Sequence, residues 1–304
     1  MGTPDFAVPC LEYLIKSKHH IVGVFCQPDK PKGRTQEIVM PPTKKLAMEN
    51  NIPVFQPVTL KNGAGVELLK EISPDLVIVI AYGKILPADF LSFPKYGCIN
   101  IHGSILPKYR GAAPIQWAVL NGDSEAGVTS MQMDAGVDTG DMLLTEKTAI
   151  GENETAEELF DRLSLLGARA LEKTLEMLEN DGLKPIKQNE EEATYVGMLS
   201  KEMSPVDFTK SAQQVHNQIR GLYSWPGATA SLSGKILKLH KSVLCDDKGN
   251  NIPGSVVCGE NRLVVCCGDN KCVELLEIQL EGKKRMSAAD FLRGRKIEKG
   301  TLLG

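Results

Sequence analysis

Apolar runs alternate with helical patterns through the first half of the chain. Short apolar, β-branched runs occur at residues 21–26 (IVGVFC), 76–81 (LVIVIA), 98–102 (CINIH) and 128–133 (VTSMQM). Apolar residues recur at helical spacing over residues 44–50, 65–72, 114–120 and 156–178. A continuous run such as LVIVIA is typical of a strand buried on both faces, as in a parallel sheet covered by helices. The pattern therefore predicts an α/β domain with a doubly wound, mostly parallel sheet.

The first residues indicate the start of a helix with no strand before it. Thr3, Pro4 and Asp5 form a helix-opening signal, with Thr3 as the N-cap and Pro4 at the first helical position. Helically spaced apolar residues follow from Ala7 onward. Because the first strand of a doubly wound sheet normally lies at its centre, we expect a natural strand of about five or six residues before Met1.

A different pattern follows the acidic stretch at residues 188–192. Residues 211–222 are predicted to form a helix, and five short strand-like runs follow it at residues 228–232, 235–244, 254–258, 262–267 and 272–280. Turn sequences such as DKGN and GDN separate these runs. Five short strands and a helix predict a small β-barrel resembling the oligonucleotide-binding (OB) fold. We therefore expect a first domain over residues 1–188, a linker over residues 189–206 and a second domain over residues 207–304.

Charge is distributed unevenly between these regions. The chain has a net charge of -3, which by itself argues against a nucleic-acid partner. From Pro205 onward, however, 15 Lys and Arg face 10 Asp and Glu, whereas the preceding residues carry 20 against 28. A basic terminal domain on an acidic body indicates an anionic partner that binds at one end.

Eight cysteines are present, but they form neither a CxxC pair nor a cluster with histidines. We therefore expect reduced thiols that pack as small apolar side chains, and no metal site. The sequence has no signal peptide and no apolar run of the roughly 18 residues that would span a membrane. A cytoplasmic protein that does not contact membranes is expected.

The densest group of reactive residues is CINIHGSILPKYRGAAP, at residues 98–114. Asn100 and His102 lie two residues apart on a predicted strand, so their side chains share one face near the strand end. An amide and an imidazole can hold a developing oxyanion, and imidazole also moves protons near neutral pH. A second loop, MDAGVDTGDM, offers Asp134, Asp138 and Asp141 as carboxylates that could reach His102. From the residues alone, a structural polar pair remains an alternative, and the three acids cannot be told apart.

These segments resemble the folate-dependent formyltransferase family. The likeness covers residues 100–114 and 133–142, and it extends in order and spacing to GTPDFAV (2–8), QPDKPKGR (27–34), AYGKILP (81–87) and GLYSWPGA (221–228). The resemblance therefore spans essentially the whole chain. In that family a short apolar segment precedes the GTP turn, which agrees with the strand expected before Met1.

The resemblance implies roles for individual residues. Asn100, His102 and Asp138 match the catalytic trio of the family, and Asp138 is chosen because VDTG is the part of its loop that aligns. The residues that match the reduced-folate site are Ser104, Ile105, Leu106, Pro107, Tyr82, Gly83 and Leu86. The implied reaction transfers the formyl group of the co-substrate 10-formyltetrahydrofolate to the amino group of initiator methionyl-tRNA, with no metal.

A monomeric enzyme that contacts tRNA through basic residues is the expected form. Lys32 and Arg34 lie in a Pro/Gly-rich loop that approaches the acceptor end in the family, although Thr35, Gln36 and Glu37 stand here where relatives are often more basic. The other candidate tRNA contacts are Lys283, Lys284, Arg285, Arg293 and Arg295. Such residues suit phosphate contacts, and a solvated surface is the alternative interpretation.

Other functions are less consistent with the sequence. Formyl transfer to a small amine, either glycinamide ribonucleotide or an amino sugar, would use the same trio, but the first such enzyme lacks a second domain and the second is usually fused to a dehydrogenase. A deformylating hydrolase of the family commonly carries an extra regulatory domain. An NAD-dependent oxidoreductase would need a GxGxxG turn after a strand, which is absent from the sequence. A pure RNA-binding module would leave the polar trio unused.

Overall fold

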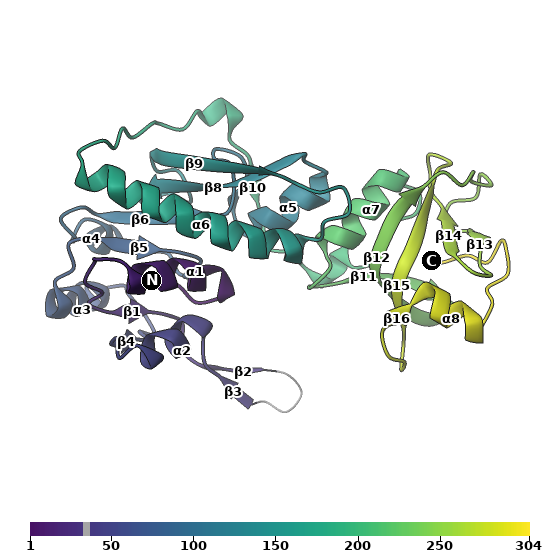
Figure 1. Ribbon diagram of the computed structural model, residues 1–304, viewed down its shortest axis with the longest axis horizontal. Coiled ribbons are helices and arrows are strands. Elements are labelled where there is room, and N and C mark those ends of the chain that lie inside the picture. Colours follow the sequence, from purple (N-terminus) through teal and green to yellow (C-terminus); the bar gives the residue numbers. More distant parts are fainter. Residues whose placement is uncertain (33–36) are drawn as a thin grey trace. The chain divides into compact units, whose positions relative to one another are not determined.

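A computed structural model describes residues 1–32 and 37–304 (Figure 1). The chain divides into two compact units. The first comprises residues 1–111, 126–148 and 160–195, and the second comprises residues 112–125, 149–159 and 196–304. Both units are therefore built from segments that are separated in the sequence.

The first unit contains the predicted parallel strands. β1 (Val24–Phe25) pairs in parallel with β4 (Val54–Phe55), and β5 (Val77–Val79) pairs in parallel with β6 (Cys98–His102). β8 (Glu125–Gln132) lies antiparallel to β6, and β9 (Met142–Ala149) completes the sheet order β5-β6-β8-β9. β2 (Lys30–Lys32) and β3 (Glu37–Val39) form a separate two-stranded pair. The predicted α/β fold class is confirmed, although β9 was not predicted because most of its residues are only partly buried.

Helices cover these strands. They are the 3₁₀ helix η1 (Asp5–Ala7), α1 (Val8–Lys16), α2 (Pro42–Glu49), α3 (Ala64–Ile72), α4 (Ala88–Leu91) and the long α6 (Ala156–Glu179) (Figure 1). A Cβ added at Gly167 of α6 would come within 3.2 Å of the Ile101 side chain, so the helix lies close against β6. The buried cluster that contains Phe25, Val79 and Phe90 joins α3 and α4 to the strands. The end of β6 is thus held in a packed layer.

Thr3 does not act as the predicted N-cap. The first turn is a 3₁₀ helix, its N-cap is Pro4, and no side chain caps it. The Thr3 hydroxyl instead donates to the Tyr82 carbonyl at 3.2 Å and accepts the Gln27 N–H at 3.2 Å. The hydroxyl therefore links two neighbouring loops, which is a tertiary role that local sequence does not indicate.

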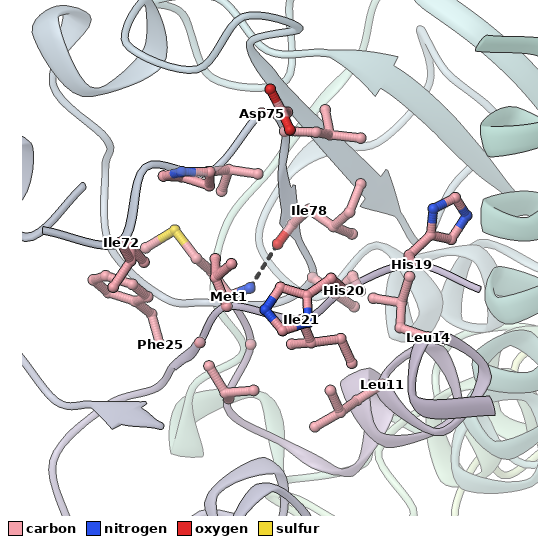
Figure 2. Close-up of a pocket in the computed structure, with 18 of the residues that line it drawn as sticks. Met1, Leu11, Leu14, His19, His20, Ile21, Phe25, Ile72, Asp75 and Ile78 are labelled. Carbon is pink, nitrogen blue, oxygen red and sulfur yellow. Dashed lines mark hydrogen bonds between the residues drawn. The ribbon is translucent and has the colours of Figure 1, made fainter. Parts of the chain in front are cut away.

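A cavity lies beside the first two residues (Figure 2). Gly2 donates its N–H to the Phe25 carbonyl at 2.9 Å, and the Met1 carbonyl accepts the Ile80 N–H at 2.8 Å. These two residues therefore bridge β1 and the end of β5 as a strand would, and Gly2 forms a parallel bridge with Ile80. Next to them is a cavity of about 350 Å³, lined mainly by apolar side chains of α1, β1, α3 and β5. Among residues 1–32 and 37–304, no strand fills the space that separates β1 from β5 beside this cavity.

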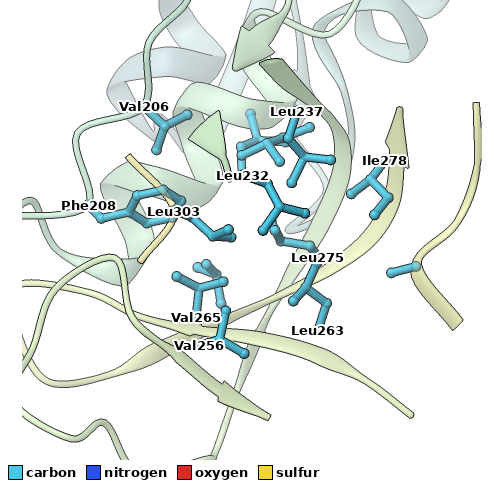
Figure 3. Packing of buried hydrophobic residues seen from close by; sticks show 14 of the residues in the cluster. Val206, Phe208, Leu232, Leu237, Val256, Leu263, Val265, Leu275, Ile278 and Leu303 are labelled. Atoms are coloured by element: carbon cyan, nitrogen blue, oxygen red, sulfur yellow. The ribbon is translucent and has the colours of Figure 1, made fainter. Parts of the chain in front are cut away.

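The second unit is built on a curled antiparallel sheet. Its strands are β11 (Ala228–Leu232), β12 (Lys235–Cys245), β15 (Cys272–Leu280), β14 (Leu263–Cys266) and β13 (Val256–Cys258), in that spatial order, with β16 (Met286–Ser287) paired to β15. The helices are α5 (Pro114–Asn121), α7 (Ala212–Gly221) and α8 (Ala288–Gly294). One buried cluster joins the sheet to α7 and α8 (Figure 3). The predicted fold of the second domain, a small β-barrel resembling the OB fold, is confirmed, and its curled antiparallel sheet forms a half-barrel.

All eight cysteines are free, and six of them are buried. Burial raises the pKa of the Cys10, Cys98, Cys267 and Cys272 thiols to about 12. No set of three or more His, Cys, Asp or Glu in the described ranges is placed to hold a metal ion. Within the same ranges, no helix combines the length and the apolar character that a membrane crossing needs.

The thiols should react slowly in the folded protein. At pH 8 a thiol with a pKa of about 12 is ionised in about one molecule in ten thousand, and the thiolate is the reactive form. Ellman's reagent should therefore modify at most two thiols within minutes, namely the half-buried Cys245 and Cys258. Denaturant should release all eight. Rapid modification of four or more thiols without denaturant would contradict this packing.

Candidate active site

His102 is fixed at the carboxyl end of β6 by a backbone contact. Its Nε2 lies 3.0 Å from the Tyr109 carbonyl oxygen, and because a carbonyl only accepts hydrogen bonds, Nε2 must carry a proton. Its Nδ1 lies 3.6 Å from Asp138 Oδ2, which is too long for a hydrogen bond but within ion-pair distance. The His102 side chain is 8% exposed and that of Asp138 is 14% exposed. The imidazole ring therefore lies between a backbone carbonyl on one side and a carboxylate on the other.

Asn100 precedes His102 by two residues on the same strand. The side chain is half-buried, and its amide forms no hydrogen bond with residues 1–32 or 37–304. Two amide N–H donors are therefore available close to the imidazole. The structure brings the predicted pair together on one face of β6 as alternation along a strand requires.

Asp138 is distinguished from the other two acids of its loop by its contacts. Its Oδ2 accepts the Gly111 N–H at 2.8 Å, beside the imidazole. The Asp134 carboxylate instead accepts hydrogen bonds from the Gly136 N–H and the Thr139 hydroxyl, so it stabilises the loop itself. The Asp141 side chain forms no hydrogen bond or ion pair in the described part of the chain, and the Asp141 carbonyl accepts the Gln132 N–H at 2.8 Å. Of the three acids that the sequence left open, Asp138 is thus the one beside His102.

The segment after His102 forms a tight turn. The Ser104 hydroxyl donates to the Lys108 carbonyl at 2.7 Å, and the Thr129 hydroxyl donates to the Ser104 carbonyl and accepts the Leu106 N–H. Ser104, Leu106 and Pro107 are buried, whereas Ile105 is partly exposed. The predicted folate segment therefore lies next to His102, with its polar groups already used to shape the turn.

The second predicted folate segment follows β5. Tyr82 and Leu86 are almost fully buried in the cluster that contains Phe25, and burial raises the pKa of Tyr82 to about 12. The Tyr82 hydroxyl has no hydrogen-bond partner in the part of the chain that the structure describes. Gly83 is exposed, with a φ of +82° and open space where a Cβ would stand. The segment thus presents backbone at Gly83 and an apolar side chain at Ile85, which is 76% exposed, while Tyr82 and Leu86 lie beneath them.

The basic residues predicted to contact tRNA differ in whether their side chains already have partners within the protein. Lys283 and Lys284 are exposed in the turn before β16. Arg285 pairs with Glu277 and donates to the Tyr223 hydroxyl at 2.7 Å, and its guanidinium lies 5.1 Å from the centre of the Tyr223 ring. The other two arginines predicted as tRNA contacts also have partners: Arg293 pairs with Asp290, and Arg295 donates to the Ser233 hydroxyl at 3.3 Å. Lys32 ends β2, and Arg34 lies outside the described residues.

Several residues beside the site were not predicted. Arg110 is fully buried and pairs with Glu190 and with the Tyr195 hydroxyl, in the first unit. Its Nε donates to Gln188 at 2.9 Å. The strands β7 (Arg110–Gly111) and β10 (Tyr195–Val196) pair next to these contacts. The sequence could not indicate this role, because Arg110 lies in an irregular stretch next to a glycine and its partners are about 80 residues further along the chain.

Models of two protein families match the chain. The model described as "Formyl transferase" matches residues 1–175, and that described as "Formyl transferase, C-terminal domain" matches residues 198–296. Between them these two matches include most of the chain. Asn100, His102 and Asp138 all lie within the first matched range.

Curated proteins similar to the whole chain carry one name. A methionyl-tRNA formyltransferase of Alkaliphilus oremlandii is 47% identical over 304 residues, which is 100% of this chain and 98% of that protein. A methionyl-tRNA formyltransferase of Clostridioides difficile is 44% identical over 305 residues, with the same coverage. Sequence similarity therefore extends over both units.

Solved structures share the fold at low identity. The sugar 3N-formyl transferase WlaRD superimposes with a TM-score of 0.70 at 24% identity, covering 93% of this chain and 97% of that one. HypX from Aquifex aeolicus, in complex with tetrahydrofolic acid, superimposes with a TM-score of 0.60 at 18% identity, covering 85% of this chain and 48% of that one.

Proposed function

Because the chain belongs to the formyl transferase family, we propose that it transfers a formyl group to the amino group of initiator methionyl-tRNA, the substrate of translation initiation. Relatives of that name match the chain from end to end. The observation that carries the chemistry is the arrangement of three side chains: the His102 Nδ1 is 3.6 Å from the Asp138 carboxylate, and Asn100 stands two residues before it on β6. This arrangement offers both oxyanion donors and a carboxylate.

The proposed reaction needs stabilisation of one developing negative charge. When bound, 10-formyltetrahydrofolate supplies the formyl carbon that the methionine amine attacks. The Asn100 amide and the His102 Nδ1–H donate hydrogen bonds to the formyl oxygen as it becomes negative. Because Nε2 already donates to Tyr109, Nδ1 is the nitrogen left for this role. Asp138 lies beside the imidazole and accepts the proton that the amine loses, directly or through water. When the tetrahedral intermediate collapses, the bond between the formyl carbon and the folate nitrogen breaks, and that nitrogen takes up a proton, so that tetrahydrofolate leaves.

The residues around the trio fit a reduced folate. We assign one wall of the proposed folate site to Ser104, Ile105, Leu106 and Pro107, and the other wall to residues 82–86. The exposed backbone at Gly83 and the exposed side chain of Ile85 can approach a flat ring. The Tyr82 hydroxyl, which has no hydrogen-bond partner among the described residues, lies in the same segment. Tyr82 and Leu86 then act by supporting this wall from beneath. Backbone and apolar contacts of this kind are common in small-molecule sites.

The proposed tRNA contacts are electrostatic. Lys283 and Lys284 are exposed and carry charge that no ion pair in the described residues balances. Arg285 follows them directly in sequence, and Arg293 and Arg295 come later in the second unit. The remaining candidates are Lys32, which ends β2, and Arg34, which lies outside the described residues. Contacts between such residues and phosphate make binding salt-sensitive, because counterions are released from the RNA. We expect the enzyme to act as a monomer in the cytoplasm, where its tRNA substrate is found.

Formyl transfer from 10-formyltetrahydrofolate tests the proposal directly. The purified chain should formylate charged initiator tRNA, and it should leave glycinamide ribonucleotide and a nucleotide-linked amino sugar unchanged at the same concentrations. Transfer to either small amine with no transfer to tRNA would show that the chain is a formyltransferase whose acceptor is not methionyl-tRNA. If a correctly folded protein transfers formyl to none of the three acceptors, the proposed function is wrong.

A further inference from the structure

Asp138 occupies a backbone conformation that needs support. Its φ is +54°, in the left-handed region that non-glycine residues rarely adopt. The tip of its loop, residues 134–137, is exposed, with Val137 54% exposed, whereas Asp138 and Thr139 are half-buried and Gly140 is buried. The carboxylate beside His102 is therefore carried by a segment that has little packing of its own. Something outside the loop must keep the carboxylate at its place.

Gln188 makes that connection. Its Nε2 donates to the Asp138 carbonyl at 2.8 Å and to the Gly140 carbonyl at 2.7 Å. Both amide protons are thus used on one short stretch of the loop. The side-chain oxygen of Gln188 accepts the Arg110 Nε–H at 2.9 Å. Gln188 is 9% exposed, so these three hydrogen bonds are largely shielded from competing water.

Arg110 fixes Gln188 in turn. Its guanidinium is fully buried, forms a two-pronged pair with Glu190 and donates to the Tyr195 hydroxyl at 2.7 Å. A planar guanidinium held at several points cannot swing away from Gln188. The Arg110 N–H also donates to the Thr194 carbonyl at 2.8 Å, so backbone and side chain are both anchored.

The same short stretch contacts both His102 and Asp138. The Tyr109 carbonyl accepts His102 Nε2–H, and the Gly111 N–H donates to the Asp138 carboxylate. Residues 109–111 therefore set the imidazole and the carboxylate relative to each other, while Arg110 reaches the far side of the Asp138 loop through Gln188. Hydrogen bonds therefore hold the loop both at the Asp138 carboxylate and at the backbone carbonyls of Asp138 and Gly140.

We propose that Gln188 and Arg110 are positioning residues, which hold the Asp138 loop so that its carboxylate stays beside His102 during turnover. This inference rests on the proposed function, since it concerns the same site. Neither residue is offered as a contact to substrate. They raise the fraction of molecules in which the Asp138 carboxylate lies beside His102. This matters because a misplacement of about 1 Å can lower a reaction rate by about 100-fold.

Gln188→Met tests the proposal, because it keeps the length and bulk of the side chain and removes all three hydrogen bonds. We expect kcat to fall about 10- to 100-fold with little change in the KM for either substrate. The matched control is Asn189→Ala on the same segment, which should leave kcat unchanged. Among the described residues, the exposed Asn189 amide bonds only to Glu191 and Glu192. A fall in Gln188→Met no larger than in the control would overturn the proposal.

A double-mutant cycle distinguishes positioning from a general loss of structure. In an Asp138→Ala background the carboxylate is gone, so adding Gln188→Met should lower kcat by less than twofold. The same 10- to 100-fold fall in both backgrounds would show that Gln188 does not act through Asp138. Arg110→Lys keeps the positive charge but loses the contact to Gln188. It should also lower kcat, by a smaller factor than Gln188→Met does, and this fall should likewise disappear in the Asp138→Ala background.

Hydrogen exchange tests the positioning without any turnover. Amides of residues 136–140 should exchange at least tenfold faster in Gln188→Met than in the unmodified protein or in Asn189→Ala, measured without substrate. If the unmodified protein transfers no formyl group but the loop loosens as expected, the proposed function fails and the positioning role stands. If exchange in the loop is unchanged, the positioning role fails whatever the activity.

Discussion

Asn100→Ala, His102→Ala and Asp138→Ala should each lower the rate of formyl transfer by about 100- to 1000-fold. Loss of one donor to a developing oxyanion removes about 2.7–4 kcal/mol of transition-state stabilisation. Asn100 supplies amide donors, and His102 supplies Nδ1–H because its other nitrogen is bonded to Tyr109. Asp138 lies 3.6 Å from the imidazole and accepts the proton that the amine loses. The measurement is single-turnover transfer to methionyl-tRNA at saturating folate.

The three variants should not be additive. Because the side chains act on one transition state, a triple variant should be little slower than the slowest single variant. Asn180→Ala serves as the matched control, since this exposed amide bonds only to the Glu176 carbonyl in the described residues, at the end of α6. Circular dichroism and the melting temperature should show that every variant is folded. Turnover within threefold of the unmodified enzyme in any of the three site variants would exclude that residue from the trio.

The second large effect concerns stability and the cavity beside Met1. A chain extended by five alternating Val and Ile residues before Met1 should melt about 5–10 °C higher than the 304-residue chain. Burial of such side chains stabilises by about 1.5–3 kcal/mol each, and ordering the backbone costs about 1–2 kcal/mol per residue. The net gain is about 2–4 kcal/mol, since the cavity of about 350 Å³ is already lined by apolar groups. Each kcal/mol is worth about 2–4 °C at this size.

A pH series makes this prediction sharper. Burial lowers the pKa of the Met1 amino group from 8.0 to about 6, so the folded state disfavours the charged amine. As the pH falls below about 8, the unfolded chain takes up this proton and the folded chain does not. The free energy of unfolding therefore decreases between pH 8 and pH 6 and changes no further, through this group, below pH 6. An extension converts the amine into an uncharged peptide group, so its advantage should be larger at pH 6 than at pH 9.

An extension of five Ser, Gly and Asn residues is the control. It removes the charge at Met1 in the same way but adds no apolar side chains. It should therefore raise the melting temperature only by the part of the increase that depends on pH. Equal melting temperatures for the apolar and the polar extension at pH 9 would show that the space between β1 and β5 does not accept a strand. Retention of formyl transfer in both would show that the site itself is unaffected.

Regular elements of the fold could be predicted from local pattern. The strand at Cys98–His102 and those at Ala228–Leu232 and Cys272–Leu280 have the bounds that their apolar runs predict. The helices of both units agree to within about two residues at each end. These elements follow from periodicity, because a buried face must recur every 2 or 3.6 residues whatever the partner is. The strands β4 and β9 and the helices α4 and α8 were missed. β4, α4 and α8 are short, and most residues of β9 are only partly buried, so their apolar patterns are weak.

The sequence by itself determined that Asn100 and His102 share a face at a strand end, since alternation along a strand is local. It could not select Asp138. β8 runs antiparallel to β6 and ends opposite Ile99, so its loop must return along the sheet to reach His102. Only the tertiary structure decides that path, and it is set by Gln188 and Gly111. A polar loop carries no periodic signal, and its hydrogen bonds join residues that are far apart in the chain and close only once the core has packed.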